Sequence, residues 1–425
     1  MRKAAGPAVF LMKAQDVLKN FDPELYDYFQ ADEKYQHSVL SFVPDENTTS
    51  PLCAAIMGSV LVNSVVKYPY SRVDALENLA VRRICELFGS EYANIRSLTI
   101  GAASRVVLQA ITRRGDVVMS LDLRKKEHCN TENLVFRFVN FGIDPNTQNL
   151  DLDDLEHRAF KHKPQLIVLS PINFPLKVDY ERIYKIAKAV GALVWCDISQ
   201  TVSLIAGGAL NSPVPYSDVV TFTSNGSMQG PLSSVILCKR ELGGAIDREV
   251  SMAGGRKAMQ ISNLAALAAR IFEMQQPIYR SYVQSVKDNA RALADGLRKG
   301  GMKIICGGTD THLVMIDTKN CAVSARGAQE LLSDCGLMVR ICNMLTADPL
   351  VRYEAVRFST FPATTRGITS QQLGVLGEMI GRFLLNPDDS NSLKLHKMVA
   401  ELTAGLPDFS SKWLERTLAA NLAAN

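Results

Sequence analysis

The sequence predicts an α/β protein with a large domain built on a mostly parallel sheet, followed by a smaller α+β domain. Three observations lead to this prediction. In the middle of the chain, apolar runs of strand length alternate with amphipathic helical segments. After about residue 275 this alternation gives way to a mixed pattern. The length of 425 residues also exceeds what one domain usually holds.

Helices in the first half of the chain are predicted from their composition and from apolar residues at helical spacing. Residues 14–36 form a helical arm, and residues 51–66 are rich in the small residues typical of a helix. Residues 75–89 are clearly amphipathic. A further helix begins within residues 97–104, and another spans residues 180–191 and ends at a glycine.

Short apolar runs predict the strands of the large domain. These runs are residues 116–123, 164–170, 192–199, 218–224 and 233–240. Because strands that alternate with helices build right-handed βαβ units, a mostly parallel sheet follows from them.

The C-terminal third begins with a long predicted helix, residues 276–299, and continues with short strands and helices. Two of these helices lie near residues 325–335 and 369–385. We therefore divide the chain into an N-terminal arm (1–50), a large domain (51–275), a small domain (276–385) and a C-terminal helical tail (386–425).

Composition excludes several classes of protein. A net charge of +4, with no basic run interleaved with aromatic residues, gives no sign of nucleic-acid binding. No apolar run reaches the roughly 18–20 residues that cross a bilayer. The nine cysteines are scattered singly, which is typical of reduced thiols and predicts neither disulfides nor a metal site. We expect a cytoplasmic protein.

Two features fall where open α/β sheets bind ligands, beyond the carboxyl ends of the strands. Asp197 ends an apolar strand, a costly place for a carboxylate that lacks a partner. The loop 223–227 follows another strand and offers hydroxyl and amide groups, but nothing that titrates near neutral pH. The small residues that open the helix within 97–104 could bind an anion through their backbone amides.

Taken with these features, several motifs resemble the fold type I pyridoxal-phosphate enzymes, and the serine hydroxymethyltransferase family in particular. The likeness covers about residues 35–385. The segments that carry it are "DENTTSP" (45–51), "ENLAVRRICELFGSEYANI" (77–95), "GALVWCDISQTVSLIAGGALNSPVPYSDVVT" (191–221), "GGTDTHLVMID" (307–317) and "RFSTFPATTRGIT" (357–369).

The resemblance implies a fold type I, aminotransferase-like large domain with a mostly parallel seven-stranded sheet. It also implies a homodimer with active sites at the subunit interface, and a lysine that forms a Schiff base with the cofactor. Asp197 matches the residue that binds the pyridinium nitrogen, and Arg357 matches the clamp for the substrate carboxylate. His128 matches a histidine that stacks on the cofactor, while Glu46 and Asn47 match the family's "ASEN" segment.

The sequence departs from the family at the residues that carry its chemistry. Against the family's "TTTTHKTLRGPRGG" loop, the histidine becomes Asn225 and the Schiff-base lysine becomes Gly226. A nearby histidine becomes Gln200. Since glycine cannot form an imine, we expect no covalent cofactor at residue 226, and we reject hydroxymethyl transfer.

Other departures affect the phosphate end of the pocket. The family's "SGS" phosphate cup becomes Thr99, Ile100 and Gly101, which places a bulky residue where the backbone must approach the phosphate. Lys67 stands near the position of the catalytic glutamate. We expect at most weak, non-covalent binding of pyridoxal phosphate through Asp197.

The sequence favours a repurposed, pyridoxal-phosphate-independent transferase that moves an acyl or aminoacyl group onto an amine in specialised metabolism. A carboxylate and an imidazole in one cleft can act as general bases. The expected catalytic residues are Asp197 and His128, and the expected substrate-binding residues are Arg357, Gln200, Ser224 and Asn225.

Two other functions stay open. One is a pseudoenzyme that assembles with an active paralogue through the family's dimer interface. The other is a module that binds a small anionic metabolite through Arg357 and Arg256. Each key residue also has a structural interpretation: His128 as a packed or surface residue, and Arg357 as half of an ion pair with Asp197 or Glu46.

Overall fold

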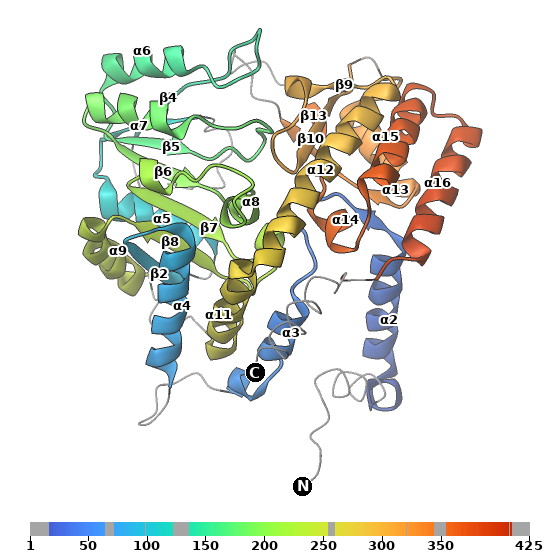
Figure 1. Ribbon diagram of the computed structural model, residues 1–425, viewed down its shortest axis with the longest axis horizontal. Helices are drawn as coiled ribbons and strands as arrows, with labels where there is room; N and C mark the ends of the chain where they lie inside the picture. Colours follow the sequence, from blue (N-terminus) through green and yellow to red (C-terminus); the bar gives the residue numbers. More distant parts are fainter. Residues whose placement is uncertain are drawn as a thin grey trace.

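The computed structural model describes residues 17–63, 72–97, 99–121, 136–253, 260–319, 321–343, 354–407 and 409. Two lobes lie side by side, a larger α/β lobe and a smaller lobe that carries the C-terminal elements (Figure 1). The long helix α12 (Pro277–Lys299) runs between them and contributes buried side chains to both cores.

A seven-stranded sheet forms the centre of the larger lobe, in the order β2-β8-β7-β6-β5-β3-β4. The five strands from β7 to β4 are mutually parallel, whereas β8 is antiparallel to both β7 and β2. This confirms the predicted fold class. The strands are β2 (Tyr92–Ser97), β3 (Val117–Ser120), β4 (Arg137–Asn140), β5 (Leu166–Leu169), β6 (Leu193–Asp197), β7 (Val219–Thr223) and β8 (Ser234–Cys238).

Helices cover both faces of this sheet, which explains why its central strands are continuous apolar runs. One face packs against α5 (Ile100–Ile111) and α9 (Arg240–Met252). The other face packs against α4 (Val73–Phe88), α6 (Leu152–His162), α7 (Tyr180–Ala189), the short α8 (Val202–Ala206), α11 (Ile261–Gln275) and the first part of α12.

The sequence prediction missed two strands, and both lie at edges of the sheet. β4 has two exposed and two half-buried residues, so it lacks the apolar run that marked the central strands. β2 interrupts its apolar residues with Asn94 and Arg96, whose side chains bond to Asp247 and Glu77. Edge strands have one neighbour and need less apolar surface, which is why their pattern is weak.

The smaller lobe contains an antiparallel sheet of order β12-β13-β10-β9 packed against helices. Its elements are β9 (Lys303–Ile304), β10 (Leu313–Asp317), α13 (Ala325–Asp334), β11 (Leu337–Met338), β12 (Arg340–Asn343), β13 (Glu354–Ser359), α14 (Phe361–Thr365) and α15 (Ser370–Leu385). A short parallel pair, β1 (Leu40–Ser41) with β11, brings Leu40 and Phe42 into the same core. The boundary drawn at residue 275 stays a prediction, because α12 serves both cores.

The described parts of both terminal segments contain helices. α2 (Pro23–Ser38) starts at the N-cap Asp22 and lies beside α16 (Asp389–Ala404) (Figure 1). α16 buries Leu395 and Val399 in the small core, so this part of the expected tail is packed. α3 (Pro51–Met57) is shorter than the helix expected over 51–66, and a 3-10 turn (Val60–Asn63) follows it.

A fully buried ion pair stands beneath the loop that follows β7. Arg270 and Glu273, both on α11, pair at 2.7 Å with side chains 0% and 3% exposed. Arg270 also donates to the Met228 carbonyl at 2.6 Å and to the Gln229 side-chain oxygen at 2.7 Å. Glu273 in turn accepts from the Ser50 hydroxyl at 2.8 Å. The pair therefore ties α11 to the loop and to the segment before α3.

We expect Arg270→Met to lower the free energy of unfolding by about 3–5 kcal/mol, because it leaves the Glu273 carboxylate buried without its counter-ion. Chemical denaturation followed by circular dichroism measures this loss. Lys185→Met is the matched control: it breaks the exposed pair of Lys185 with Glu181, 2.7 Å apart, and should cost less than about 1 kcal/mol. Equal losses in the two variants would contradict the assigned role of Arg270.

Candidate functional site

Asp197 lies at the carboxyl end of β6, as predicted, and its side chain is almost fully buried, at 3% exposure. One carboxylate oxygen accepts from the Ser199 backbone amide at 3.0 Å, and the other from the Thr221 hydroxyl at 3.0 Å. The Thr221 hydroxyl oxygen in turn accepts a hydrogen bond from the Trp195 indole N–H. In the described part of the chain no ion pair involves Asp197, and the donors that its carboxylate accepts from are neutral.

Three neighbouring parallel strands end at this edge of the sheet. Asn173 follows β5, Asp197 ends β6, and the loop 224–230 follows β7. Ser199 joins the last two, because its hydroxyl accepts from the Thr223 amide at 3.2 Å and its carbonyl accepts from Ser227 at 3.0 Å. The edge is thus one connected surface, as the parallel topology requires.

Within the loop, Ser224 and Asn225 have different surroundings. Ser224 is fully buried, and its hydroxyl faces the Pro231 carbonyl at 2.5 Å and the Ser233 carbonyl at 3.1 Å. The hydroxyl therefore donates its single proton within the same loop region, and that proton is not available to a substrate. Asn225 is half-buried, and its side-chain oxygen accepts from the Thr223 hydroxyl, which leaves its amide group for a ligand.

Gly226 stands in the left-handed region, with φ of +58°. A Cβ atom added there would come within 3.2 Å of the backbone carbonyl oxygen of Asp45. A side chain at residue 226 would therefore face both an unfavourable backbone conformation and a close contact. At the position that the resemblance assigns to the Schiff-base lysine, the backbone conformation and the nearby Asp45 carbonyl thus favour glycine.

Arg357 lies on β13, the small-domain strand that pairs with both β10 and β12, and it is 6% exposed. Its guanidinium donates to the Asn173 side-chain oxygen at 2.8 Å and to the Asp45 carboxylate at 3.2 Å. The partner in the ion pair is therefore Asp45, and neither Asp197 nor Glu46. The bond to Asn173 joins the small domain to the carboxyl edge of the large sheet.

Asp45 also contacts Gln200, which places two predicted substrate-binding residues around one carboxylate. The Gln200 amide donates to the second Asp45 oxygen at 2.6 Å. Gln200 Oε1 and Arg357 Nε are buried and have no partner in the described part of the chain. Sequence reasoning did not select Asp45 or Asn173, although Asp45 lies within the "DENTTSP" motif that carries the resemblance.

Thr99 and Gly101, the former phosphate-cup positions, lie at the start of α5. Thr99 is exposed and caps the helix by accepting from the Ala102 amide at 3.2 Å. The helix starts at the same edge of the sheet as Asp197, because β2 runs parallel to β7 across the intervening β8. A Cβ atom at Gly101 would meet no atom within 4 Å.

Three residues singled out from the sequence lie outside the described residues: His128, Lys67 and Arg256. The described residue Lys239 follows β8 at the opposite edge of the sheet. There it donates to Asp218 at 2.8 Å and to the Tyr184 hydroxyl at 3.1 Å. Lys239 therefore stands away from Asp197.

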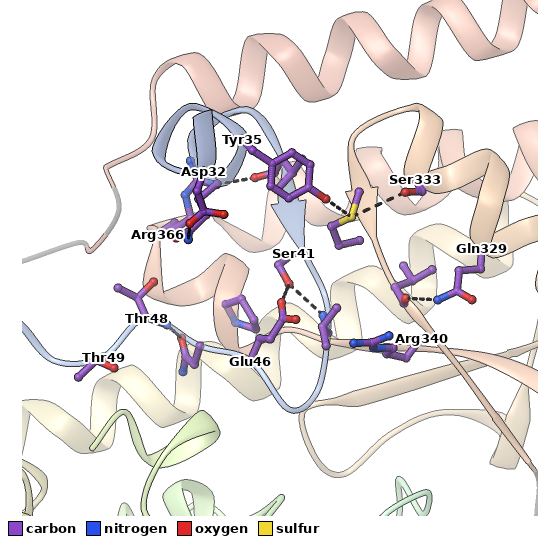
Figure 2. Close-up of a pocket in the computed structure, with 17 residues that line it drawn as sticks. Asp32, Tyr35, Ser41, Glu46, Thr48, Thr49, Gln329, Ser333, Arg340 and Arg366 are labelled. Carbon is purple, nitrogen blue, oxygen red and sulfur yellow. Dashed lines mark hydrogen bonds between the residues drawn. The ribbon is translucent and has the colours of Figure 1, made fainter. Parts of the chain in front are cut away.

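Glu46 lines a cavity that does not include Arg357. Figure 2 shows this cavity, of about 700 Å³, between α2, the segment 41–49, α13 and the start of β12. Glu46 accepts from the Ser41 hydroxyl at 3.1 Å there. The described residues that line the cavity include neither Asp45 nor Arg357.

His312 is a buried group near Arg357 that sequence reasoning did not select. It is 0% exposed, and its ring packs against Phe361 at a centroid distance of 4.7 Å. Both ring nitrogens lack a hydrogen-bond partner in the described part of the chain. Burial, together with the nearby Arg357 charge, lowers the pKa of the imidazole to about 3, so the ring is neutral at neutral pH.

The fold and this edge together define a fold type I architecture of the pyridoxal-phosphate type: a seven-stranded mixed sheet, an aspartate ending β6, and a small domain that supplies an arginine. A sequence profile described as "Serine hydroxymethyltransferase" matches residues 18–380. The chain belongs to the serine hydroxymethyltransferase family.

Two curated relatives show the extent of the similarity. The chain is 30% identical over 410 residues to a serine hydroxymethyltransferase of Coprothermobacter proteolyticus, covering 93% of this chain and 98% of the relative. It is 32% identical over 398 residues to a serine hydroxymethyltransferase of Rhodopirellula baltica, covering 90% and 94% respectively. The similarity thus spans both lobes, and the members of this family are transferases.

Pyridoxal phosphate, the cofactor of this family, fits these residues only in part. Asp197, with both oxygens oriented by Ser199 and Thr221, suits a protonated pyridine nitrogen. Gly226 offers no amine for a covalent bond, and its surroundings leave little room for one.

In the described part of the chain, no helix is both long and apolar enough to cross a membrane. The same residues contain no group of three or more His, Cys, Asp or Glu side chains able to hold a metal ion.

The neutral, buried His312 should make the protein sensitive to acid. Its pKa is about 3 when folded and about 6.5 when unfolded, so the unfolded chain takes up the proton first as the pH falls. Stability should therefore fall by about 1.4 kcal/mol per pH unit, starting below about pH 6.5 and continuing toward pH 3. Urea unfolding at a series of pH values should show a shallower loss for His312→Leu. His157→Asn, at an exposed position, should keep the wild-type slope; identical slopes for all three proteins would contradict this role of His312.

Proposed function

We propose that this protein is a transferase that works without a Schiff base and moves an acyl or aminoacyl group onto an amine in specialised metabolism. The observation that carries the proposal is the combination of Gly226, held at a positive φ against the Asp45 backbone, with a buried Asp197 whose donors among the described residues are neutral. The covalent chemistry of the family has no group at residue 226, while a proton acceptor remains in the cleft.

Asp197 supports an amine as the acceptor substrate. A buried carboxylate without a cationic partner in the described part of the chain favours a ligand that brings an N–H or a positive charge. Asn225 and Gln200 supply amide groups nearby for orientation. His128 is a second proton acceptor in this proposal, on the basis of the family resemblance.

The proposed reaction balances without a cofactor. The amine nitrogen forms a bond to the acyl carbon of a thioester or ester, and the bond from that carbon to the leaving group breaks with its electron pair. The proton lost by nitrogen passes to the Asp197 carboxylate and then to the leaving group. General-base catalysis of this kind contributes about 10²–10⁴-fold in rate.

The alternative of an anion-binding module receives less support. Arg357, its main cation, already pairs with Asp45, so a metabolite anion would have to compete with an internal carboxylate. No specific observation favours a non-catalytic partner of an active paralogue. A cytoplasmic location and weak, non-covalent pyridoxal phosphate binding remain parts of our proposal.

We expect purified protein mixed with pyridoxal phosphate to show no Schiff-base absorbance and no adduct after borohydride reduction, because residue 226 has no amine. Absorbance spectroscopy and intact-protein mass spectrometry measure the two outcomes. A reduced adduct mapped by peptide sequencing to any lysine of the cleft would overturn the proposal of Schiff-base-independent chemistry. An adduct on an exposed lysine such as Lys185 would be the non-specific background to subtract.

Replacing Asp197 by Asn should lower amide formation by about 100-fold or more, since it removes the proton acceptor while keeping the shape of the side chain. Mass spectrometry of reactions that pair small amines with acyl thioesters and aminoacyl esters gives the measurement. Asp218→Asn is the matched control, a buried carboxylate at the opposite edge of the same sheet. Its loss should reduce stability and leave turnover per folded molecule unchanged; an equal loss of turnover would argue against Asp197.

We further propose that the protein is a homodimer, as the family resemblance implies. Exposed apolar side chains on and next to α2 support this: Phe21 is 87% exposed and Tyr28 is 69% exposed. Sedimentation equilibrium should give a dimer for the wild type, and a weaker dimer for the double variant Phe21→Glu with Tyr28→Glu. Phe160→Glu, on α6 and 52% exposed, should leave assembly unchanged. A monomeric wild type would refute the proposal.

A further inference from the structure

The Asp45 carboxylate lies at the meeting point of the two lobes. One oxygen bonds to Gln200 at 2.6 Å and the other to Arg357 at 3.2 Å, while the Asp45 backbone carbonyl borders Gly226. A single residue thus contacts Gln200 in the segment after β6, the small-domain arginine and the glycine of the β7 loop. None of these contacts was predicted from the sequence.

The backbone is anchored on both sides of Asp45, which places its carboxylate next to Arg357 although the Asp45 side chain is 59% exposed. On the N-terminal side, Phe42 donates to the Met338 carbonyl at 2.8 Å and accepts from the Ser359 amide at 2.7 Å. On the C-terminal side, the Ser50 amide donates to the Gln229 carbonyl at 2.9 Å. Both ends of the short segment 42–50 are therefore anchored to the core.

Asp45 is positioned to neutralise the positive charge of Arg357. A guanidinium that is 6% exposed needs a counter-ion, because burying a lone cation is costly. Asp45 supplies this negative charge from within the chain. A second carboxylate, brought by a ligand to the same guanidinium, would meet a group that is already neutralised and an adjacent like charge.

We propose that Asp45 determines ligand specificity by occupying Arg357 in place of a ligand carboxylate, so that the cleft selects amino-acid derivatives whose carboxyl group is an amide or ester. This inference rests on the proposed amine-accepting function and names its substrate class. Two buried polar atoms lack a partner in the described part of the chain and match such a ligand once it displaces the atoms that cover them: Gln200 Oε1 accepts from an N–H, and Arg357 Nε donates to a neutral carbonyl oxygen.

The test compares glycine with glycinamide, two ligands that differ in the charge of the carboxyl group. Isothermal titration should show that wild-type protein binds glycinamide at least about tenfold more tightly than glycine. Asp45→Ser frees Arg357 and should shift the affinity ratio toward glycine by about tenfold or more. Asp45→Asn removes only the charge and should shift the ratio in the same direction, which covers the case in which the serine variant folds poorly.

Two further variants separate the charge of Asp45 from general effects. Glu46→Gln removes a negative charge one residue away, on a side chain that bonds to Ser41, and should keep the ratio within about twofold of wild type. Adding Arg357→Met to Asp45→Ser should abolish the gain in glycine binding. If wild type binds glycine as well as glycinamide, binds neither, or keeps its ratio in both Asp45 variants, the inference is wrong. Because these titrations need no turnover, a shifted ratio in a protein that forms no amide would refute the proposed reaction alone.

Discussion

The buried pair of Arg270 and Glu273 is the constraint on which the arrangement of the cleft depends. Arg270 holds the Met228 carbonyl and the Gln229 side chain, and Glu273 holds Ser50. Gln229 continues the chain of bonds to Thr365 of α14 in the small domain. This one ion pair therefore positions the β7 loop and the segment before α3, and through Gln229 it links the two lobes. With every charge paired, the network can be buried without a large penalty.

A second ion pair, Asp45 with Arg357, completes this arrangement from the other side of the same segment. Residues 45–50 lie between the two pairs, one end bound to the small domain and the other to α11. The close approach of the Asp45 backbone to Gly226 follows from this anchoring. Gly226 and the internal carboxylate at Arg357 are thus parts of one local structure.

Much of the fold could be predicted from the sequence because burial on two faces leaves a strong pattern. β5 and β8 are uninterrupted apolar runs, and α7 repeats its apolar residues at helical spacing. β4 and β2 were missed because an edge strand needs fewer apolar residues. The helix predicted over 51–66 ended early, at Met57, because small residues allow a helix without giving it a face to bury.

For the site, the sequence by itself determined that Asp197 ends a strand, that residue 226 carries no amine, and that Arg357 belongs to the small domain. These facts follow from residue identity and from the rule that parallel strands end at one edge of a sheet. Only the tertiary structure decided what Arg357 binds, because its partner Asp45 is 312 positions away in the chain. An ion pair between two lobes depends on how the lobes pack. The sequence pattern around either residue contains no information about which distant residue will lie beside it. The same packing buried Ser224 and His312, which sequence alone could not separate from exposed polar residues.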